Sequence, residues 1–309
     1  MDRKKVLTLK TLKFLEREQF NVSVDDTKTS CFDLLARRRS FILMLRFLLN
    51  IDGLSEEHAE DMKALSGLFS AYPLLIGERT RHFDLQDGVL YGRYGINAMT
   101  VWTFENIISC SLYPLVISSR GGYYVRIDGE KLRRMRTEKN ISVGELAECI
   151  GVSRTMVYSY ENSGLGATLS TVLRLEEYLD DTLTLPLEVF SIPSPEEHEV
   201  SVEEPQKHVF ARLEMIGFDI HPIRRAPFDA VTKGEEEFML TKVDRKPSRT
   251  IKDIRIIKEV SDVASCTAFV VADWPKAKEN VAGVPVIKSS ELDRIESQDE
   301  FLETLEQRR

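Results

Sequence analysis

The sequence predicts a multidomain protein in which two similar α/β domains flank a small all-α module. Three observations predict it: strand-like and helix-like segments occur in the same order near both ends, helix-turn-helix spacing lies between them, and an acidic, proline-rich segment follows. A chain of 309 residues is long enough for two or three domains. We expect an α/β domain at 1–118, a β-hairpin with the helical module at 119–190, a linker at 191–205 and the second α/β domain at 206–309.

The N-terminal segment alternates aromatic and β-branched runs with one amphipathic stretch. Such runs favour strands, and apolar residues at helical spacing favour a helix, for which Ser55 is the capping candidate. The expected strands are 20–24, 32–36, 41–48, 74–77 and 96–101, and the expected helix is 54–72.

A glycine-containing turn separates two short strands before the helical module. Residues 118–122 read Ser-Ser-Arg-Gly-Gly and lie between β-prone runs at 115–117 and 123–127. This composition is typical of a β-hairpin.

The central module has the spacing of consecutive short helices. Leu132 and Met135 belong to the first helix, Ser142 caps the second, and Gly151 ends it. Ser153 caps a third helix. Val157 and Tyr160 lie on one face of this third helix, and the small Ala147 lets two helices cross closely. Residues 169–179 would close the core with Val172, Leu173, Leu175 and Tyr178, and 186–190 is a candidate fifth helix.

The segment after the linker repeats the first one. Strands are expected at 218–223, 228–232, 238–243, 268–272 and 284–288, with a helix at 250–264. Asp33 precedes Arg46 by the interval that separates Asp229 from Lys242. The repeat predicts duplicated α/β domains, and the alternative is two unrelated sheets with similar apolar patterns.

Composition narrows the function classes. The net charge of −8 gives no general attraction to nucleic acid, so DNA affinity requires a local patch. No signal peptide or membrane-spanning stretch is evident, which predicts a cytoplasmic protein with no membrane partner. The four cysteines are scattered and the histidines lack ligand spacing, so we expect buried free thiols, no metal site and no cofactor.

At these residues the module resembles the Cro/repressor-type helix-turn-helix family. The residues that match the sequence motif of this family are Ser142, Leu146, Ala147, Gly151, Val152, Ser153 and Glu161. The resemblance implies that the third helix enters the major groove of double-stranded DNA, where Arg154, Thr155 and Tyr158 read or line the groove and Ser153 contacts a phosphate. The expected DNA-binding residues are Ser142, Val143, Ser153, Arg154, Thr155, Tyr158 and Ser159.

Two features weaken the expected DNA contact. Val143 stands where the family commonly has glutamine, and a valine cannot donate a hydrogen bond to a phosphate. The module is also not basic, since acidic residues surround Arg133, Arg134 and Arg136, which are expected to form a solvated face. Binding is therefore expected to require a homodimer. The alternative is a helical bundle with no role on DNA.

The flanking domains loosely resemble the PD-(D/E)xK nuclease family. In that family two carboxylates hold Mg²⁺ and a lysine stabilises developing charge. Asp33 or Asp229 would be the first acid, and Arg46 or Lys242 would take the place of the lysine. Met44 and Leu240 stand where the second acid belongs. We expect degenerate scaffolds with no catalytic residues, their aspartates satisfied by arginines such as 37–39 or 224–225; Asp52 or 235–237 could replace the missing acid.

The full order of segments resembles the archaeal family of helix-turn-helix transcriptional regulatory proteins. The resemblance implies a DNA-binding transcriptional regulator that is not an enzyme. One alternative is an adaptor that contacts the transcription machinery, and another is a Mg²⁺-dependent nuclease.

Overall fold

A computed structural model describes residues 2–27, 29–162, 166–194, 202–235, 237–244, 250–272, 274 and 277–309. The chain forms two compact units. The first unit combines Met1–Phe47, Leu54–Leu74 and Ile192–Arg309, and the second combines Leu48–Gly53 and Leu75–Ser191. The domain limits that we expect from the sequence remain a prediction.

The N-terminal half begins with a helix that the strand-based interpretation missed. Helix α1 (Arg3–Arg17) starts at Asp2, whose carboxylate accepts a hydrogen bond from the amide of Lys4, and it buries Leu7, Thr11 and Leu15. Its low apolar content hides the four-residue spacing of this buried stripe. The antiparallel strands β1 (Asn21–Val24), β2 (Leu34–Arg38) and β3 (Phe41–Asn50) follow.

The rest of this half alternates helices and strands. A short 3-10 turn, η1 (Ile51–Gly53), precedes α2 (Glu56–Phe69), and the hydroxyl of Ser55 caps α2 as expected. The later elements are β4 (Tyr72–Arg79), β5 (Val89–Arg93), β6 (Ile96–Met99) and α3 (Val101–Cys110). Two predicted ends were wrong: Tyr72 begins a strand, and Thr100 caps a helix that starts at Val101.

The C-terminal half has matching elements. Its helices are α8 (Gln206–Met215), α9 (Thr250–Ala264), α10 (Ser289–Leu292) and α11 (Gln298–Gln307). Its strands are β10 (Asp219–Pro222), β11 (Ala230–Lys233), β12 (Phe238–Asp244), β13 (Thr267–Ala272), β14 (Asn280–Val281) and β15 (Val284–Lys288). Phe218 and Phe269 both pack edge-on against Phe301 of α11 in its core.

The two halves share one topology. The N-terminal sheet has nine strands, of which the first six in order are β1-β2-β3-β4-β6-β5. The C-terminal sheet has the order β10-β11-β12-β13-β15-β14, and a helix precedes the first strand of each sheet. The third strand pairs in parallel with the fourth in the C-terminal sheet, with Met239 opposite Thr267. The predicted second α/β domain that resembles the first is therefore confirmed.

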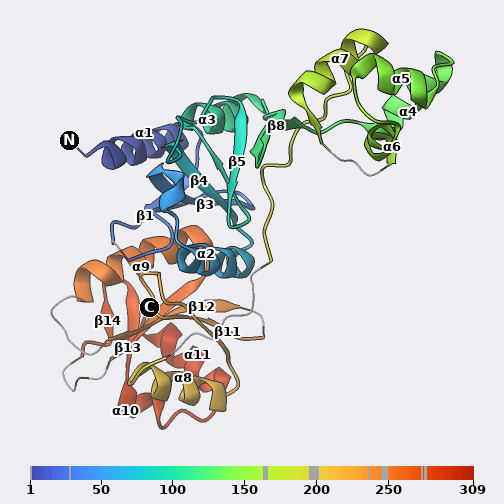
Figure 1. Ribbon diagram of the computed structural model, residues 1–309. Coiled ribbons are helices and arrows are strands. Elements are labelled where there is room, and N and C mark those ends of the chain that lie inside the picture. The colour runs from blue at the N-terminus through green and yellow to red at the C-terminus, as the bar shows by residue number, and fades with distance from the viewer. Residues whose placement is uncertain are drawn as a thin grey trace. The chain divides into compact units, whose positions relative to one another are not determined.

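The halves pack against each other within the first unit, where α2 and α9 meet the opposite half (Figure 1). Phe69 of α2 lies 5.6 Å from Phe238 and 6.2 Å from Phe228, measured between ring centroids. The amide of Cys31 donates to the carbonyl of Arg225 at 2.8 Å. Aromatic packing and main-chain hydrogen bonding thus join two segments that are far apart in sequence.

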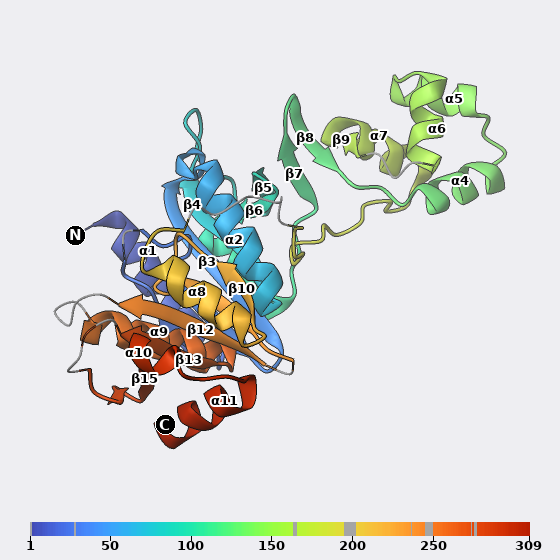
Figure 2. The ribbon, with the colours of Figure 1, turned by 90° about the horizontal axis from the view of Figure 1, so that it is seen from below.

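The second unit carries the hairpin and the helical module. Strands β7 (Val116–Ser119) and β8 (Gly122–Val125) form the expected hairpin, and β9 (Ala167–Thr168) extends it. Helices α4 (Gly129–Glu138), α5 (Val143–Ile150), α6 (Arg154–Asn162) and α7 (Leu169–Leu179) form the module, seen from a second direction in Figure 2.

The predicted fifth helix at 186–190 is wrong. Residues 186–190 form no helix or strand, and the amide of Leu187 donates to the carbonyl of Pro114. Leu173 and Tyr178 were also misplaced in the core: they are 58% and 37% exposed, whereas Val172, Leu175 and Leu179 are buried. None of the helices in the described part of the chain combines the length and apolarity needed to cross a bilayer.

Candidate nucleic-acid interface

Local hydrogen bonds set the limits of the helices in the module. The hydroxyl of Ser142 accepts from the amide of Glu145 at 3.1 Å, and Gly151 ends α5 with φ at +72°, a conformation that glycine adopts without strain. Ser153 then caps α6 by accepting from the amide of Met156 at 3.2 Å. The turn between α5 and α6 is therefore short and fixed at both ends.

Helix α6 has one buried and one exposed face. Val157 and Tyr160 are 0% and 3% exposed and pack into the module's core. Arg154, Thr155 and Tyr158 are exposed, and so is the capping Ser153. Three of the predicted DNA-binding residues thus lie at the start of α6, and Tyr158 follows one turn later on its exposed face.

The other predicted residues lie at the edge of this surface. Ser142 is exposed at the start of α5, whereas Val143 is half-buried and packs against the core. Ser159 is half-buried on α6. The DNA-binding role of all seven residues remains a prediction.

Gly144 is a residue that sequence reasoning missed. A Cβ atom at this position would lie 2.9 Å from both Nε and Nη2 of Arg154. The guanidinium of Arg154 therefore lies directly over the main chain in the first turn of α5. A glycine inside a short helix, which costs stability relative to alanine, was the signal that could have identified it.

Arg136 does not belong to a solvated face. Its guanidinium makes two hydrogen bonds to Glu161, at 2.6 and 3.1 Å, and a third to the carbonyl of Ile141. The hydrogen bonds to Glu161 raise the pKa of Arg136 above its usual value. The basic surface of α4 is left to Arg133 and Arg134, which are exposed as expected.

Two of the module's acidic residues are satisfied internally. Glu161 is 6% exposed and paired with Arg136. The carboxylate of Glu176 accepts from the amides of Leu183 and Thr184 at 2.8 and 3.0 Å. The acidic composition of the module therefore overstates the negative charge that its surface presents.

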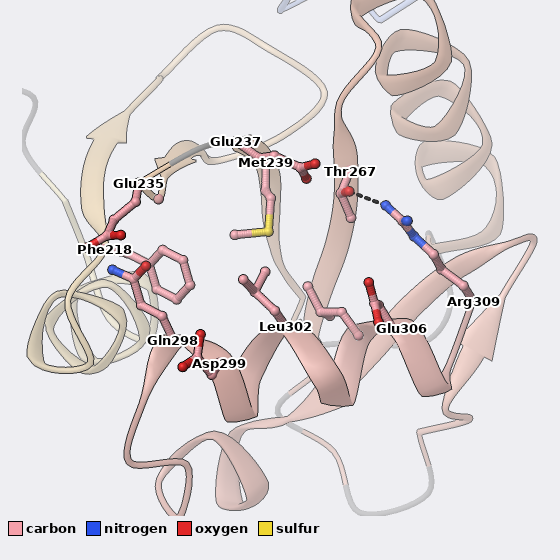
Figure 3. Close-up of a pocket in the computed structure, with 12 residues that line it drawn as sticks. Phe218, Glu235, Glu237, Met239, Thr267, Gln298, Asp299, Leu302, Glu306 and Arg309 are labelled. Carbon is pink, nitrogen blue, oxygen red and sulfur yellow. Dashed lines mark hydrogen bonds between the residues drawn. The ribbon is translucent and has the colours of Figure 1, made fainter.

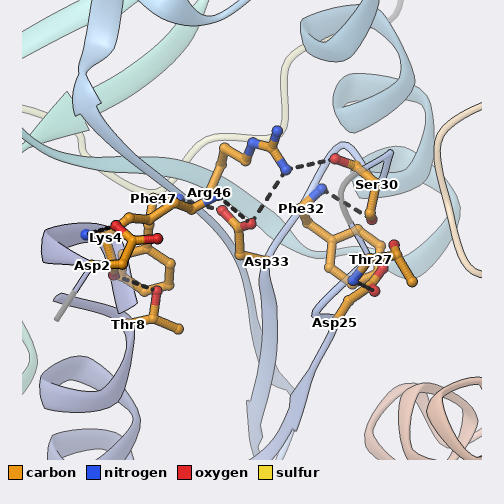
Figure 4. Close-up of polar contacts among 10 residues, drawn as sticks. All are labelled: Asp2, Lys4, Thr8, Asp25, Thr27, Ser30, Phe32, Asp33, Arg46 and Phe47. Atoms are coloured by element: carbon orange, nitrogen blue, oxygen red, sulfur yellow. Dashed lines mark hydrogen bonds and ion pairs between the residues drawn. The ribbon is translucent and has the colours of Figure 1, made fainter. Parts of the chain in front are cut away.

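Asp33 occupies the place of the first acid in the nuclease-like half (Figure 4). Its Oδ1 accepts from Nζ of Lys4 at 2.8 Å and lies 3.3 Å from Nη1 of Arg46, and its Oδ2 accepts from the amide of Phe47 at 2.7 Å. The carboxylate is satisfied as expected, but by Lys4 and Arg46 and not by the arginines at 37–39.

Asp229 has the same arrangement in the C-terminal half. Its Oδ1 accepts from Gln206 at 2.9 Å and from Nζ of Lys242 at 3.2 Å, and its Oδ2 accepts from the amide of Val243 at 2.7 Å. Gln206 comes from α8, just as Lys4 comes from α1. Arg225 was wrongly expected here; it pairs with Glu57 and Asp61.

The candidates for the missing second acid lie elsewhere. Met44 and Leu240 are fully buried, and Asp52 pairs with Arg93. Glu235 and Glu237 line a separate pocket, and Glu236 lies outside the described residues. Within the described ranges, no three His, Cys, Asp or Glu residues are grouped to hold a metal ion.

The cysteines divide into two kinds. Burial raises the pKa of Cys31 well above its usual value and that of Cys266 to about 12. Cys110 and Cys149 are exposed, so the expectation of four buried thiols was wrong for these two.

A pocket in the C-terminal half has an apolar floor and an acidic rim (Figure 3). Phe218, Met239 and Leu302 form the floor, and carboxylates from the β11–β12 turn and from α11 surround it. These carboxylates would repel nucleic-acid phosphates, which disfavours the pocket as a DNA-contact surface. The acidic lining residues are Glu235, Glu237, Asp299 and Glu306.

Comparison with known proteins identifies the family. Residues 4–114 match the PD-(D/E)XK superfamily domain, and residues 132–183 match a helix-turn-helix family. A "putative HTH-type transcriptional regulatory protein" from Pyrococcus furiosus is 39% identical, over 99% of this chain and 98% of the relative. The chain belongs to this archaeal family.

Further relatives carry the same description. The proteins from Methanothermobacter thermautotrophicus and Archaeoglobus fulgidus are 38% and 35% identical, covering 91% and 96% of this chain and 89% and 96% of their own lengths. The crystal structure of the restriction-modification controller protein C.AhdI from Aeromonas hydrophila is 34% identical, covers 17% of this chain and 80% of that chain, and has a TM-score of 0.17.

Proposed function

We propose that this family member is a sequence-specific DNA-binding transcriptional regulator that reads the major groove through the start of α6. The observation that carries the proposal is the division of α6 into a buried face and an exposed face that carries Arg154, Thr155 and Tyr158. Arginine can bind guanine through two hydrogen bonds, and threonine and tyrosine can contact neighbouring bases or phosphates. Val157 and Tyr160 anchor the helix so that these side chains point outward.

Selection of bound sequences from random duplexes tests the proposal. The wild-type protein should enrich one motif, and Arg154→Ala should lose about 1–3 kcal/mol of discrimination at one position of that motif. Arg133→Ala, an exposed arginine on α4, is the matched control and should keep the preference. Equal discrimination by the Arg154→Ala protein would reject this role. Retention of basal transcription factors without any DNA preference would favour an adaptor.

We further propose that two copies bind together. Leu169 and Leu173 lie four residues apart on one side of α7 and are 40% and 58% exposed. An exposed apolar pair on a module that is not basic supports dimerisation through α7. Leu173→Glu should convert a dimer into a monomer in light scattering and should weaken binding to a two-fold symmetric site. A wild-type monomer at micromolar concentration would contradict this assignment.

We also propose that the nuclease-like halves are not catalytic. Lys4, Arg46 and a main-chain amide already occupy the carboxylate oxygens of Asp33, and Gln206, Lys242 and an amide occupy those of Asp229. These donors compete with a divalent cation for the same oxygens. Incubation with DNA and Mg²⁺ should give no cleavage. Cleavage that disappears in Asp33→Ala would overturn the proposal.

A further inference from the structure

Helix α1 concentrates positive charge in a chain that is acidic overall. Its fifteen residues contain six basic side chains and one glutamate, while the whole chain has a net charge of −8. Lys4 is used internally, since it binds Asp33. The other five basic side chains of α1 give this helix a positive charge that the acidic composition of the whole chain does not explain.

The exposed cations of α1 lie opposite its buried stripe. Leu7, Thr11 and Leu15 face the core, and at about 100° per residue Lys5, Lys13 and Arg17 fall on the other side. All three are exposed. Within the described part of the chain, their side chains form no hydrogen bond or ion pair.

A second group of cations lies just beyond the end of α1. Arg37 and Arg38 at the end of β2 and Arg39 in the β2–β3 turn line a hollow together with Gln19 and Asn21. Nε of Arg37 donates to the carbonyl of Arg39 at 2.7 Å, and Nη1 of Arg38 donates to the carbonyl of Glu18 at 3.1 Å. Carbonyl groups thus position two guanidiniums without neutralising them, although the Glu18 carboxylate, 3.8 Å from Arg38, offsets part of the charge.

We propose that α1, the end of β2 and the β2–β3 turn form a phosphate-binding surface for the backbone of duplex DNA, independent of base sequence. The phosphate surface consists of Lys5, Lys13, Arg17, Arg37, Arg38 and Arg39. The choice of DNA as the polyanion rests on the proposed function.

The spacing of the charges favours a polyanion. Lys5 and Arg17 are twelve residues apart on a helix, which corresponds to about 18 Å at a rise of about 1.5 Å per residue. One phosphate group cannot span this distance, whereas a DNA backbone presents phosphates along its whole length. Arginine and lysine contacts of this kind position a protein on DNA and do not read its sequence.

Salt-dependent binding to a random-sequence duplex tests the phosphate surface in the full-length protein. The variant replaces Lys5, Lys13, Arg17 and Arg39 with glutamine. The control replaces Lys207, Arg255, Lys278 and Arg294 with glutamine, which removes two lysines and two arginines that are exposed in the C-terminal half. Both proteins therefore change net charge equally.

The slope of log K against log salt is the decisive measurement. Its magnitude should fall by about 0.9 for each phosphate that the variant no longer neutralises, or by up to about 3.6 for four. Between about 50 and about 200 mM salt, the wild-type protein should then lose roughly 150-fold more affinity than the variant. The control should keep the wild-type slope. An unchanged slope in the variant would overturn the proposal, as would tight binding to anionic vesicles or RNA without binding to duplex DNA.

Two further measurements keep the result interpretable. If the quadruple variant unfolds, the double variants Lys5→Gln/Lys13→Gln and Arg17→Gln/Arg39→Gln should each reduce the slope by about half as much. Arg154→Ala should change sequence preference and keep most of the slope. If the surface variants keep the wild-type slope while Arg154→Ala loses the sequence preference, only the phosphate surface is rejected. If the surface variants lower the slope while Arg154→Ala keeps the sequence preference, only the reading role of α6 is rejected.

Discussion

At the scale of single residues, Gly144 determines where the predicted reading side chain lies. The Arg154 guanidinium covers the Gly144 main chain, and a methyl group there would lie 2.9 Å from two of its nitrogens. Arginine is flexible, so it would move away without disturbing the helices.

Gly144→Ala should therefore have opposite effects on stability and on recognition. Alanine favours a helix by about 1 kcal/mol over glycine, so the protein should be at least as stable in thermal unfolding. Base discrimination in the duplex selection assay should nevertheless fall, because Arg154 is displaced. Gly67→Ala in α2 has open space around its Cβ and serves as the control for helix propensity. Unchanged discrimination in Gly144→Ala would show that the position of Arg154 does not matter.

Asp25 is a buried carboxyl, and no lysine or arginine among the described residues forms an ion pair with it. It is 2% exposed, and its Oδ1 accepts from the amide of Thr27 at 2.8 Å. Burial, the largest influence on this group, raises the pKa of Asp25 above its ordinary value of 3.8. The folded state thus binds this proton more tightly than the unfolded state, and the charged carboxylate lowers stability at neutral pH.

Asp25→Asn should be more stable than the wild type at pH 7. The advantage should shrink as the pH falls toward 3.8, where Asp25 becomes protonated in both folded and unfolded chains. Urea unfolding at several pH values measures the difference. A variant that is less stable than the wild type at pH 7 would contradict this explanation.

The sequence predicted the aspartates of the two halves better than their partners. The equal sequence spacing predicted that Asp33 and Arg46 occupy positions equivalent to those of Asp229 and Lys242. Both aspartates form an ion pair with the predicted partner. Lys4 and Gln206 were not predicted, because both lie on helices outside the expected elements. A residue's partner can be inferred only after the element that carries it is known.

At the scale of elements, the sequence predicted the helices with strong apolar spacing most closely. Residues 250–264 and 169–179 are helices with the expected limits, because their apolar spacing is strong. Helix α1 was missed because lysines and arginines dominate it. The segment 186–190 was misread because its apolar residues pack and hydrogen-bond without forming a helix, a tertiary effect that local spacing does not reveal.

The contact between α4 and α6 provides a test at this scale. A Cβ on Gly129 would overlap the carbonyl oxygen of Tyr160 and lie 2.9 Å from that of Glu161, and neither main-chain atom can rotate away. Gly129→Ala should therefore destabilise the module by about 1–3 kcal/mol. Hydrogen exchange of the α4 and α6 amides should become faster, while exchange in α9 stays unchanged. Unaltered exchange in α4 would contradict the prediction, because it would show that α4 and α6 can move apart without a loss of stability.

At the scale of the whole molecule, the segments at the two ends of the chain form one unit. The sequence predicted two similar domains but not that they pack together, because the aromatic contacts of Phe69 with Phe228 and Phe238 join residues more than 150 positions apart. Contacts of this kind depend on tertiary structure that no local pattern encodes.

Cutting the chain between the halves tests this packing. A protease recognition sequence inserted into the acidic, proline-rich segment that the sequence predicts as a linker would divide the chain between the halves. The two fragments should still elute together in size-exclusion chromatography at moderate salt, because apolar burial does not depend on an intact linker. Separation of the fragments under these conditions would show that the packing is too weak to persist without the covalent connection.

The isolated β-bridge between Ile127 and Thr184 bears on how readily the helical module could be replaced. The chain enters and leaves the four-helix segment at neighbouring points, and Leu185 and Leu187 continue the pairing on the exit side. Segments with adjacent ends are the ones that tolerate excision and insertion, because the remaining chain needs only a short turn to close. The helical module that we propose to contact DNA can thus be exchanged for another module with similarly placed ends, and we expect such an exchange to alter the bound DNA sequence.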